Sequence, residues 1–510
     1  MKDHRPSFSW ILESLFPSKS PSLTDSDLTM RFSQLSTALW ASSLPQALAS
    51  PHKRARSGND GACIDVDVAI IGGGSAGIHA AISLKDAGAN VVVIEKKSQI
   101  GGHAETYVNP QNNVKANIGV VIFQDTPIVQ NYFDRLKVPS TKVNTSALSL
   151  GEHKSYDFKL GIPVPAQTPQ QQAASQQAIG AAMQAYMANV LPKYPWIDQG
   201  WFIPQPVPEE LTLPFGQFAQ KYGFAALLPV ISQFNWYPGN ITTIPALYGI
   251  KSWGPGLINS FLNGFIVPTS GDTRSIYNAA AAELGNSVLL NSTVVHVDRH
   301  DHGVKLVVKQ QNQKAKKINA RKLIIAVPQT IENIGSYDLS EGERSLFSKF
   351  SALTYMAGVA NIPGLNVSLT NVGALTPANV PLIPGSNAYN AFGSPGQFLL
   401  GVAFDRADTT DEDSKAVIRR ELATLAKVGA VPADAAAKVT FPYLSNHAPF
   451  NLRVSSQDIA AGFYKKLLSL EGSRNTYWTG AAFAGHNSGV IWAWNEGTML
   501  PQIKKDLGLK

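Results

Sequence analysis

Three glycines at the end of an apolar run constrain this chain most. Residues 66–71 are mostly β-branched and apolar, and they lead into Gly72, Gly74 and Gly77 with the spacing G-x-G-x-x-G. The first glycine permits a tight turn, the second lets the backbone approach a pyrophosphate, and the third lets a helix pack closely on a strand. The segment therefore predicts a buried parallel strand, a phosphate-binding loop and a helix over residues 78–87.

The next residues continue this pattern. A second strand is predicted over residues 91–94 and ends at Glu95, about 20 residues beyond the glycines, where a carboxylate can accept both hydroxyls of an adenosine ribose. An acid at this position disfavours the 2′-phosphate of NADP. Because strand, loop, helix, strand and acid occur in order, we expect a bound dinucleotide, with Ser75 and Ala76 of the loop in its site. The fingerprint alone leaves FAD and NAD open.

A second glycine pair decides between the two cofactors. Ile100-Gly101-Gly102-His103 resembles the glycine pair that follows the ribose-binding acid in the FAD-binding amine oxidase and phytoene desaturase superfamily. Many members have an arginine after the pair. Here it is His103, as in a subgroup that includes flavin-dependent fatty-acid double-bond isomerases and the fungal β-cyclopiazonate dehydrogenase family. The resemblance implies FAD as the cofactor, with Gly101, Gly102 and His103 in its site.

The C-terminal region resembles the closing FAD motif of the same superfamily. In residues 475–500, Gly480 matches the first glycine of that motif, but Ala481 stands where a glutamate is usual. The resemblance implies that Val490 and Ile491 supply helix-start amides near the flavin.

A mid-chain segment resembles the superfamily's return to the cofactor domain. It comprises a predicted helix over residues 275–284 and strands over residues 288–290, 294–297 and 323–327. The resemblance implies that the backbone of Val295 meets the adenine.

With 510 residues the chain exceeds what one core usually holds, so we expect more than one domain. The resemblance implies an α/β fold, a Rossmann-like FAD-binding domain of the amine oxidase type with an interleaved α+β substrate domain. The expected segments are a leader and linker (1–60), the FAD-binding domain in three parts (61–150, 266–334 and 446–510), a helical, aromatic cap (151–265) and a substrate domain (335–445).

The segment from 194 to 253 is unusually rich in aromatic residues and prolines. Aromatic side chains bury large areas and prolines impose irregular connections, so we expect helices and loops that cap a substrate cavity. Most of these rings are expected in the core and a few in the cavity wall. The aromatic residues are Trp196, Trp201, Phe202, Phe215, Phe218, Tyr222, Phe224, Phe234, Trp236, Tyr237, Tyr248 and Trp253.

Charge and cysteine content favour no nucleic-acid, metal or disulfide function. The net charge is +7, but the basic residues are scattered except for the run 314–317, which fits a solvated hairpin loop. Cys63 is the single cysteine, and the ten histidines include no H-E-x-x-H spacing. We therefore expect no metal site and no nucleic-acid partner.

The first sixty residues do not fit the fold. From Met30 a moderately apolar stretch leads to Ala47-Leu48-Ala49, which resembles a secretory signal peptide with an A-x-A site; a leader without fixed structure in a cytoplasmic protein is the alternative. Glycosylation sequons, relevant if the protein is secreted, occur at Asn144, Asn240, Asn291 and Asn366. No stretch is long and apolar enough to span a bilayer.

The resemblance implies flavin chemistry on an apolar organic molecule. Our first hypothesis is hydride abstraction from an allylic or heteroatom-adjacent carbon, in a dehydrogenation or oxidative cyclisation of a fungal alkaloid, terpenoid or meroterpenoid, with oxygen as one candidate acceptor. The alternative is redox-neutral isomerisation of a polyunsaturated fatty acid. A noncatalytic FAD-binding protein is a third hypothesis.

Catalytic side chains are harder to assign. His103 beside the flavin could tune it or hold it covalently, or could be a hydrogen-bonded structural residue. His486 and Asn487 precede the flavin helix and could touch substrate or flavin, although Asn487 could also cap that helix. Trp492 and Trp494 cannot share a helix face, so at most one is expected in the cavity wall. Tyr355 and Tyr443 are weaker candidates.

Overall fold

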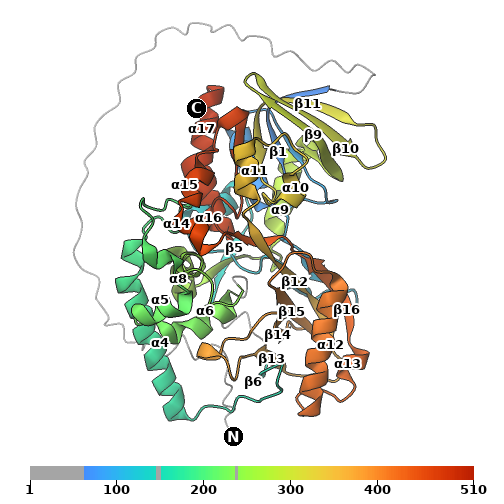
Figure 1. The fold of residues 1–510 in the computed structure, drawn as a ribbon. Helices are drawn as coiled ribbons and strands as arrows, with labels where there is room; N and C mark the ends of the chain where they lie inside the picture. Colours follow the sequence, from blue (N-terminus) through green and yellow to red (C-terminus); the bar gives the residue numbers. More distant parts are fainter. Residues whose placement is uncertain (1–62, 145–150, 236–238) are drawn as a thin grey trace, which may run out of the picture.

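The computed structural model describes residues 63–144, 151–235 and 239–510, and the predicted leader, with its signal-like segment, lies outside them. Two seven-stranded sheets form the framework, and a group of helices lies beside them (Figure 1). The cofactor sheet lies at the upper end of this view, the second sheet below it, and the cap helices to one side. The pocket described below lies where cap, second sheet and cofactor region meet.

The first sheet has the strand order β8-β2-β1-β11-β10-β9, and β18 pairs with β11. Strands β8, β2, β1, β11 and β18 run parallel, whereas β11, β10 and β9 form an antiparallel meander. The strands are β1 (Cys63–Ile71), β2 (Val91–Ile94), β8 (Val288–Leu289), β9 (Ser292–His300), β10 (Gly303–Gln310), β11 (Lys316–Ile325) and β18 (Thr476–Trp478). Three distant parts of the chain therefore build one sheet.

Burial explains why the centre of this sheet is parallel. All four residues of β2 are buried, as is the second half of β1, because helices cover both faces. The covering helices are α2 (Ser75–Asp86), α3 (Pro127–Arg135), α9 (Ser275–Leu284), α10 (Ile331–Ile334), α11 (Glu341–Phe347), α16 (Ser488–Trp494) and α17 (Leu500–Leu507). Small residues along α2 let it pack closely on β1 and α16.

The second sheet has the order β16-β12-β15-β14-β13-β6, and β17 pairs with β12. Its strands are β6 (His153–Tyr156), β12 (Ser351–Asn361), β13 (Ser368–Asn371), β14 (Gly385–Ala391), β15 (Gln397–Phe404), β16 (Thr440–Asn446) and β17 (Phe450–Arg453), and α12 (Asp411–Lys427) and α13 (Ala435–Lys438) lie beside them. Strand β6 lies inside the predicted cap segment, and β17 lies inside the predicted third FAD segment. The second sheet therefore draws on more of the chain than residues 335–445.

The cap consists of one long helix and several short helices around an aromatic core. They are α4 (Pro169–Asn189), α5 (Phe215–Lys221), α6 (Leu228–Phe234), α7 (Ala246–Lys251) and α8 (Pro255–Asn263). Most aromatic side chains of this segment are buried, whereas Phe202 is 41% exposed. Trp236 and Tyr237 lie outside the described residues. Packing among rings, rather than periodicity, holds these short helices in place.

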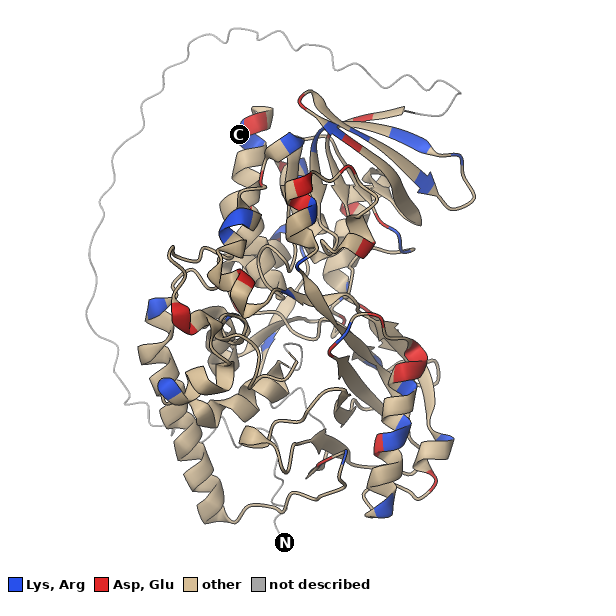
Figure 2. Cartoon of the chain, viewed as in Figure 1, with Lys and Arg blue, Asp and Glu red and all other residues tan. Residues whose placement is uncertain are grey.

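The remaining elements connect these parts. Two small ladders join β3 (Thr106–Val108) to β4 (Lys115–Asn117) and β5 (Ser140–Val143) to β7 (Phe265–Pro268), and two short helices, α14 (Ser456–Ala460) and α15 (Phe463–Leu468), lead into β18. Lysines, arginines and acidic residues are interspersed over the ribbon (Figure 2). Within the described ranges no helix is long and apolar enough to cross a membrane, and no cluster of three histidine, cysteine or acidic side chains could hold a metal ion.

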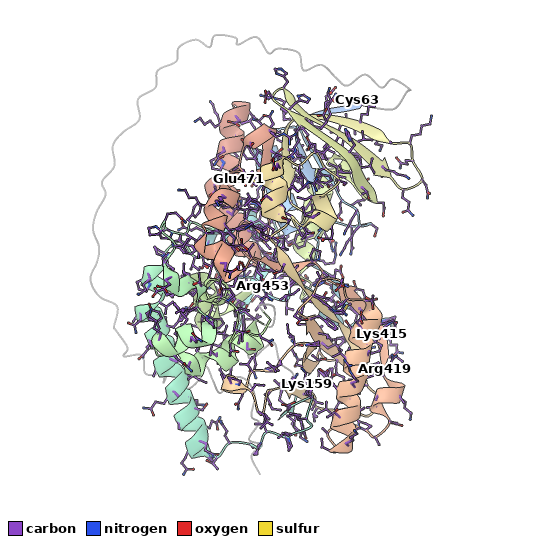
Figure 3. The ribbon with its side chains drawn as sticks, viewed as in Figure 1. Cys63, Lys159, Lys415, Arg419, Arg453 and Glu471 are labelled. Carbon is purple, nitrogen blue, oxygen red and sulfur yellow. The ribbon has the colours of Figure 1, made fainter. Side chains whose placement is uncertain are left out.

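Figure 3 places two labelled residues at different levels of the molecule. Cys63 is exposed and reduced at the start of β1, far from the region where the two sheets meet. Arg453, the last residue of β17, lies in that central region. The lone thiol is therefore remote from the pocket.

Candidate active site

The two glycine turns face each other without side chains between them. Gly72 has a φ of +108°, and a Cβ on Gly77 would lie 2.1 Å from the Gly72 carbonyl oxygen. A Cβ on Gly102 would lie 3.0 Å from the Cα of Gly74, so the first and second glycine motifs meet backbone to backbone. This leaves a backbone-lined cradle at the start of α2, as a dinucleotide phosphate requires.

Glu95 holds this cradle in place. Its carboxylate is buried, accepts the backbone N–H of Gly73 at 2.7 Å and accepts the backbone N–H of Lys97 at 2.8 Å. Each oxygen keeps capacity for a further donor, such as a ribose hydroxyl. Lys97 in turn donates its Nζ to the carbonyl of Gly102 at 3.1 Å and to Glu105 at 2.7 Å. Backbone and side-chain bonds thus join the end of β2 to the second glycine pair.

The predicted adenine strand lies beside Glu95. The backbone N–H of Glu95 donates to the carbonyl of Leu289, and the N–H of Ser292 donates to the carbonyl of Glu95, both at 2.9 Å. Val295 follows on β9 with its side chain 49% exposed, whereas the side chain of Val294 is buried. The position of Val295 as an adenine contact stays a prediction.

The closing segment reaches the same cradle. Gly480 has a φ of +105° just after β18, and a Cβ there would meet only the carbonyl oxygen of Ala326, at 3.8 Å. Asn487 caps α16 by accepting the N–H of Gly489 at 2.8 Å. Ser75 Oγ donates to Ser488 Oγ at 3.0 Å, which joins the N-terminal ends of α2 and α16. Val490 and Ile491 lie in the first turn of α16, with buried side chains.

Trp492 packs in the core of the cofactor domain. Its ring is fully buried against Tyr132, Phe123 and His79, and its Nε1 donates to Ser75 Oγ at 3.0 Å. Trp494 is buried as well and donates to the carbonyl of Trp478. Neither indole lines the pocket described below. Trp492 is therefore a packing residue rather than a catalytic candidate.

Three histidines and a phenylalanine gather between the cofactor loops and the second sheet. The ring centroids of His103 and His447 lie 4.4 Å apart, and those of His486 and Phe450 lie 3.8 Å apart. His103 and His486 are 6.3 Å apart. The sequence pointed to His103 and His486. It gave no sign of His447, which follows β16 and joins the cluster only through the fold.

Burial keeps this cluster uncharged. It lowers the pKa of His447 and of His486 to about 3 and lowers the pKa of His103 well below its usual value. Proximity of the rings adds to the effect, since one imidazolium disfavours another. Among the described residues, Nε2 of His447 and Nδ1 of His486 have no hydrogen-bond partner. Two buried ring nitrogens are thus available to a bound molecule.

The two tyrosines named as weaker candidates have structural partners. Tyr443 donates its hydroxyl to Glu105 at 2.7 Å and so ties β16 to the cofactor loops. Burial, together with this bond, raises the pKa of Tyr443. Tyr355 on β12 packs against Phe450 and His447.

A Cβ on Gly119 would lie 1.5 Å from the carbonyl oxygen of His103, so this glycine is required where the chain passes the histidine cluster.

A pocket opens next to His486 on the cap side. The cap contributes Trp201, Asn235, Tyr248, Lys251 and Ser252; β17 contributes Asn451 and Leu452; and the loop before α16 contributes Ala481, Gly485 and His486. Ala481 is the residue that replaces the usual glutamate of the closing motif. Aromatic walls are combined here with amide, ammonium and imidazole groups. The cap, the second sheet and the flavin-helix loop therefore share one pocket.

These features fit FAD. The glycine cradle, the acid at the end of β2 and the start of α16 lie on one continuous surface, because Ser75 touches Ser488 and Gly102 touches Gly74. Residues that would hold FAD are those of the two glycine turns and Glu95, together with Gly480 and the first turn of α16. One of the two unpartnered imidazole nitrogens belongs to His486, which lines the pocket.

Comparisons with known proteins agree with this site. A family profile described as an NAD(P)-binding Rossmann-like domain matches residues 70–136. The chain is 52% identical over 486 residues to the FAD-dependent oxidoreductase dpchF of Colletotrichum higginsianum, covering 94% of this chain and 100% of the relative. It is 30% identical over 436 residues to beta-cyclopiazonate dehydrogenase of Aspergillus flavus, covering 85% and 92%.

Solved structures share the fold. A CLA-producing fatty acid isomerase from P. acnes superposes with a TM-score of 0.68 at 20% identity, covering 86% of this chain and 98% of that chain. Cyclohexylamine oxidase from Brevibacterium oxydans superposes with a TM-score of 0.58 at 16% identity, covering 87% and 100%. The Rossmann-like fold of the amine oxidase type is thereby confirmed.

The site and these matches define a FAD-dependent oxidoreductase, which confirms the expected cofactor and enzyme class. The chain belongs to the family of fungal FAD-dependent oxidoreductases that includes beta-cyclopiazonate dehydrogenase.

The four sequons differ in accessibility. Asn144, Asn291 and Asn366 are exposed. Asn240 is half-buried, and its side-chain oxygen accepts the backbone N–H of Ile383 at 3.2 Å. Glycosylation and secretion stay predictions.

Proposed function

We propose that this oxidoreductase abstracts hydride from an allylic or heteroatom-adjacent carbon of a largely apolar organic molecule, in a dehydrogenation or oxidative cyclisation step of fungal secondary metabolism. The observation that carries the proposal is the shared pocket, whose walls join aromatic cap residues to the loop that leads into α16. FAD, when bound, supplies the hydride acceptor for such chemistry. The family relationship to beta-cyclopiazonate dehydrogenase supports a fungal metabolite as substrate.

The protein's own contribution beside the cofactor loops is a cluster of three uncharged imidazoles. Because the three imidazoles are uncharged, they place no positive charge against a carbon that loses hydride and becomes cationic. Trp201 and Tyr248 supply ring faces and have satisfied polar atoms, so they present apolar surface to the substrate. Direct hydride transfer needs no general base, and the proposal assigns none.

The test needs the natural substrate. Deletion of the gene in the native host should make this substrate accumulate, and the compound can then be isolated. FAD-saturated protein should convert this compound, in the presence of air, to a product two hydrogen atoms lighter, with consumption of oxygen or of an added electron acceptor. Mass spectrometry and an oxygen electrode measure both changes.

Two other results would contradict the proposed oxidation and support a different function. A product of unchanged mass, formed without any acceptor, would show an isomerase, the alternative that the resemblance of His103 and its neighbours leaves open. If FAD-saturated protein left the accumulated compound unchanged under all acceptor conditions, a noncatalytic role would follow.

A further inference from the structure

Lys251, the last residue of α7, is a half-buried lysine in the pocket wall. Its Nζ donates to the carbonyl of Gly200 at 2.9 Å and to the carbonyl of Ile197, and lies 4.7 Å from the ring centroid of Trp201. Among the described residues, no carboxylate forms an ion pair with this ammonium. Asp198 is the acidic group that acts on it, but that carboxylate accepts the backbone N–H of Gly256 at 2.7 Å.

The lysine stem lies on the loop that leads to the flavin helix. Gly485 has a φ of +129°, and a Cβ there would lie 2.5 Å from Cε of Lys251. His486, the next residue, lines the same pocket and contacts Phe450. The absence of a side chain at Gly485 is therefore what lets Lys251 reach this loop. An ammonium group and the imidazole cluster border one space.

The pocket wall keeps unused hydrogen-bond donors on Lys251 and Asn235. An ammonium has three N–H groups, and two of those on Lys251 are bonded to carbonyls. Within the described part of the chain, the buried side-chain nitrogen of Asn235 has no partner. Among the other donors of the wall, Trp201 bonds to the carbonyl of Ala482, Tyr248 to Tyr464 and Ser252 to the carbonyl of Gly249. The remaining N–H of Lys251 and the side-chain nitrogen of Asn235 would be satisfied by a ligand with oxygen acceptors.

Partial burial disfavours the charged form of Lys251 when no ligand is bound. An ammonium removed from water and lacking a paired carboxylate is disfavoured, and burial lowers the pKa of Lys251 to about 7. An anionic oxygen in the pocket would reverse that effect by pairing with the cation.

We propose that the substrate carries an anionic oxygen group, a carboxylate or an enolate, which Lys251 and Asn235 bind at the cap side of the pocket. This inference rests on the proposed function, because it names the class of substrate for the same site. The apolar remainder of the molecule then lies against Trp201, Tyr248 and Leu452, toward His486. The lysine acts as a binding residue and takes no part in hydride transfer.

Binding of small probes tests this directly. Calorimetric titration of FAD-saturated protein at pH 7 would compare 2-naphthoate with its neutral isostere 2-acetylnaphthalene. It would also compare the enolate of 5-phenylcyclohexane-1,3-dione with the neutral enol methyl ether. We expect at least one anion to bind at least about tenfold more tightly than its neutral partner, the range of a hydrogen bond to a charged group. The pair that shows the preference identifies carboxylate or enolate recognition.

Substitutions show which residues cause the tighter binding of the anion. Lys251→Met should abolish the preference for the anion, whereas Lys221→Met, which removes an exposed lysine of the same cap, should leave it unchanged. Asn235→Asp keeps the shape of the side chain but adds negative charge, and should weaken the anion more than the neutral probe. It carries the test if Lys251→Met does not fold. Equal binding of anion and neutral partner by the wild type, or an unchanged preference in both pocket variants, would overturn the inference.

The result is independent of turnover. If the anion preference depends on Lys251 but no compound is oxidised, the inference stands and the proposed function fails. If a substrate is oxidised with the same kcat/KM by wild type and Lys251→Met, and no anion preference exists, the function stands and the inference fails.

Discussion

Glu95 links the phosphate loop to the end of β2 through two backbone N–H groups. Replacing it by alanine leaves one buried and one partly buried donor without an acceptor, so Glu95→Ala should lower the free energy of unfolding by about 2 kcal/mol. The FAD content of the purified protein should fall as well, because the ribose loses its acceptor. Glu95→Gln keeps one side-chain oxygen and should lose less of both. Urea denaturation and FAD per chain measure these effects, and an alanine variant with wild-type values would contradict the role of Glu95.

His447 makes stability depend on pH. The pKa of His447 is lowered from 6.5 to about 3 in the folded protein, so the unfolded chain binds the proton first as pH falls. The contribution of neutral His447 is fully present above pH 6.5 and is lost as pH falls toward 3. It should reduce the free energy of unfolding by up to about 1.4 kcal/mol per pH unit in that window.

A substitution separates this effect from other titrations. His447→Phe should flatten the decline in stability between pH 6.5 and lower values, when denaturation is followed at a fixed excess of FAD. His302→Gln, on an exposed turn between β9 and β10, is the control and should keep the wild-type slope. If His447→Phe also kept that slope, His447 would not be a neutral, buried group.

These residues mark what the sequence could and could not reveal. Glu95 was predictable because its role follows from a local order of strand, loop, helix and strand. His103 and His486 were found because each adjoins a cofactor motif. His447 and Lys251 carry no such signal. One follows β16 and the other ends α7, and only tertiary packing brings His447 to the imidazole cluster and Lys251 to the pocket.

Between elements, a buried ion cluster joins β9 to α11. The side chain of Arg299 is fully buried and bonds to Glu343 through two nitrogens at 2.8 Å and to Asp338 at 2.7 Å. Arg299→Leu should destabilise the protein by about 3–5 kcal/mol, because it leaves a buried carboxylate without its main cation. Thermal or urea unfolding measures this loss.

Two further variants test whether the unpaired buried charge causes this loss of stability. Arg299→Leu combined with Glu343→Leu should recover part of the stability, since no buried charge then lacks a partner. Arg321→Leu removes an exposed ion pair with Asp67 and should change stability by less than about 1 kcal/mol. Similar losses for Arg299→Leu and Arg321→Leu would show that the buried cluster is not what joins the two elements.

Element boundaries were predicted best where the local pattern was strong. The predicted ranges 91–94 and 275–284 coincide with β2 and α9. Strands β6 and β17 were not predicted. Both are only four residues long, and each is a strand because a distant partner, β13 or β12, pairs with it. Such pairing leaves no period in the local sequence.

At the scale of the whole molecule, the active site depends on parts of the chain that are far apart. Strands β1 and β2, β8 to β11, and β18 come from three regions but form one sheet, and α16 returns to the N-terminal end of α2. The second sheet and the cap close the site from the other side, with the polar link from Tyr443 to Glu105 between them. The fold class could be inferred because each of the three regions carries its own cofactor motif. The pocket could not, because no single region contains it.

The most direct test of the proposed FAD-dependent oxidation is an absorbance spectrum of the purified protein. The spectrum is followed anaerobically as the compound accumulated by the deletion strain is added. We expect a flavin band corresponding to about one FAD per chain, which bleaches on addition of the compound and returns when air or another acceptor is admitted. Absence of a flavin band even after FAD is supplied, or turnover of the compound with no bleaching and no use of an acceptor, would contradict it.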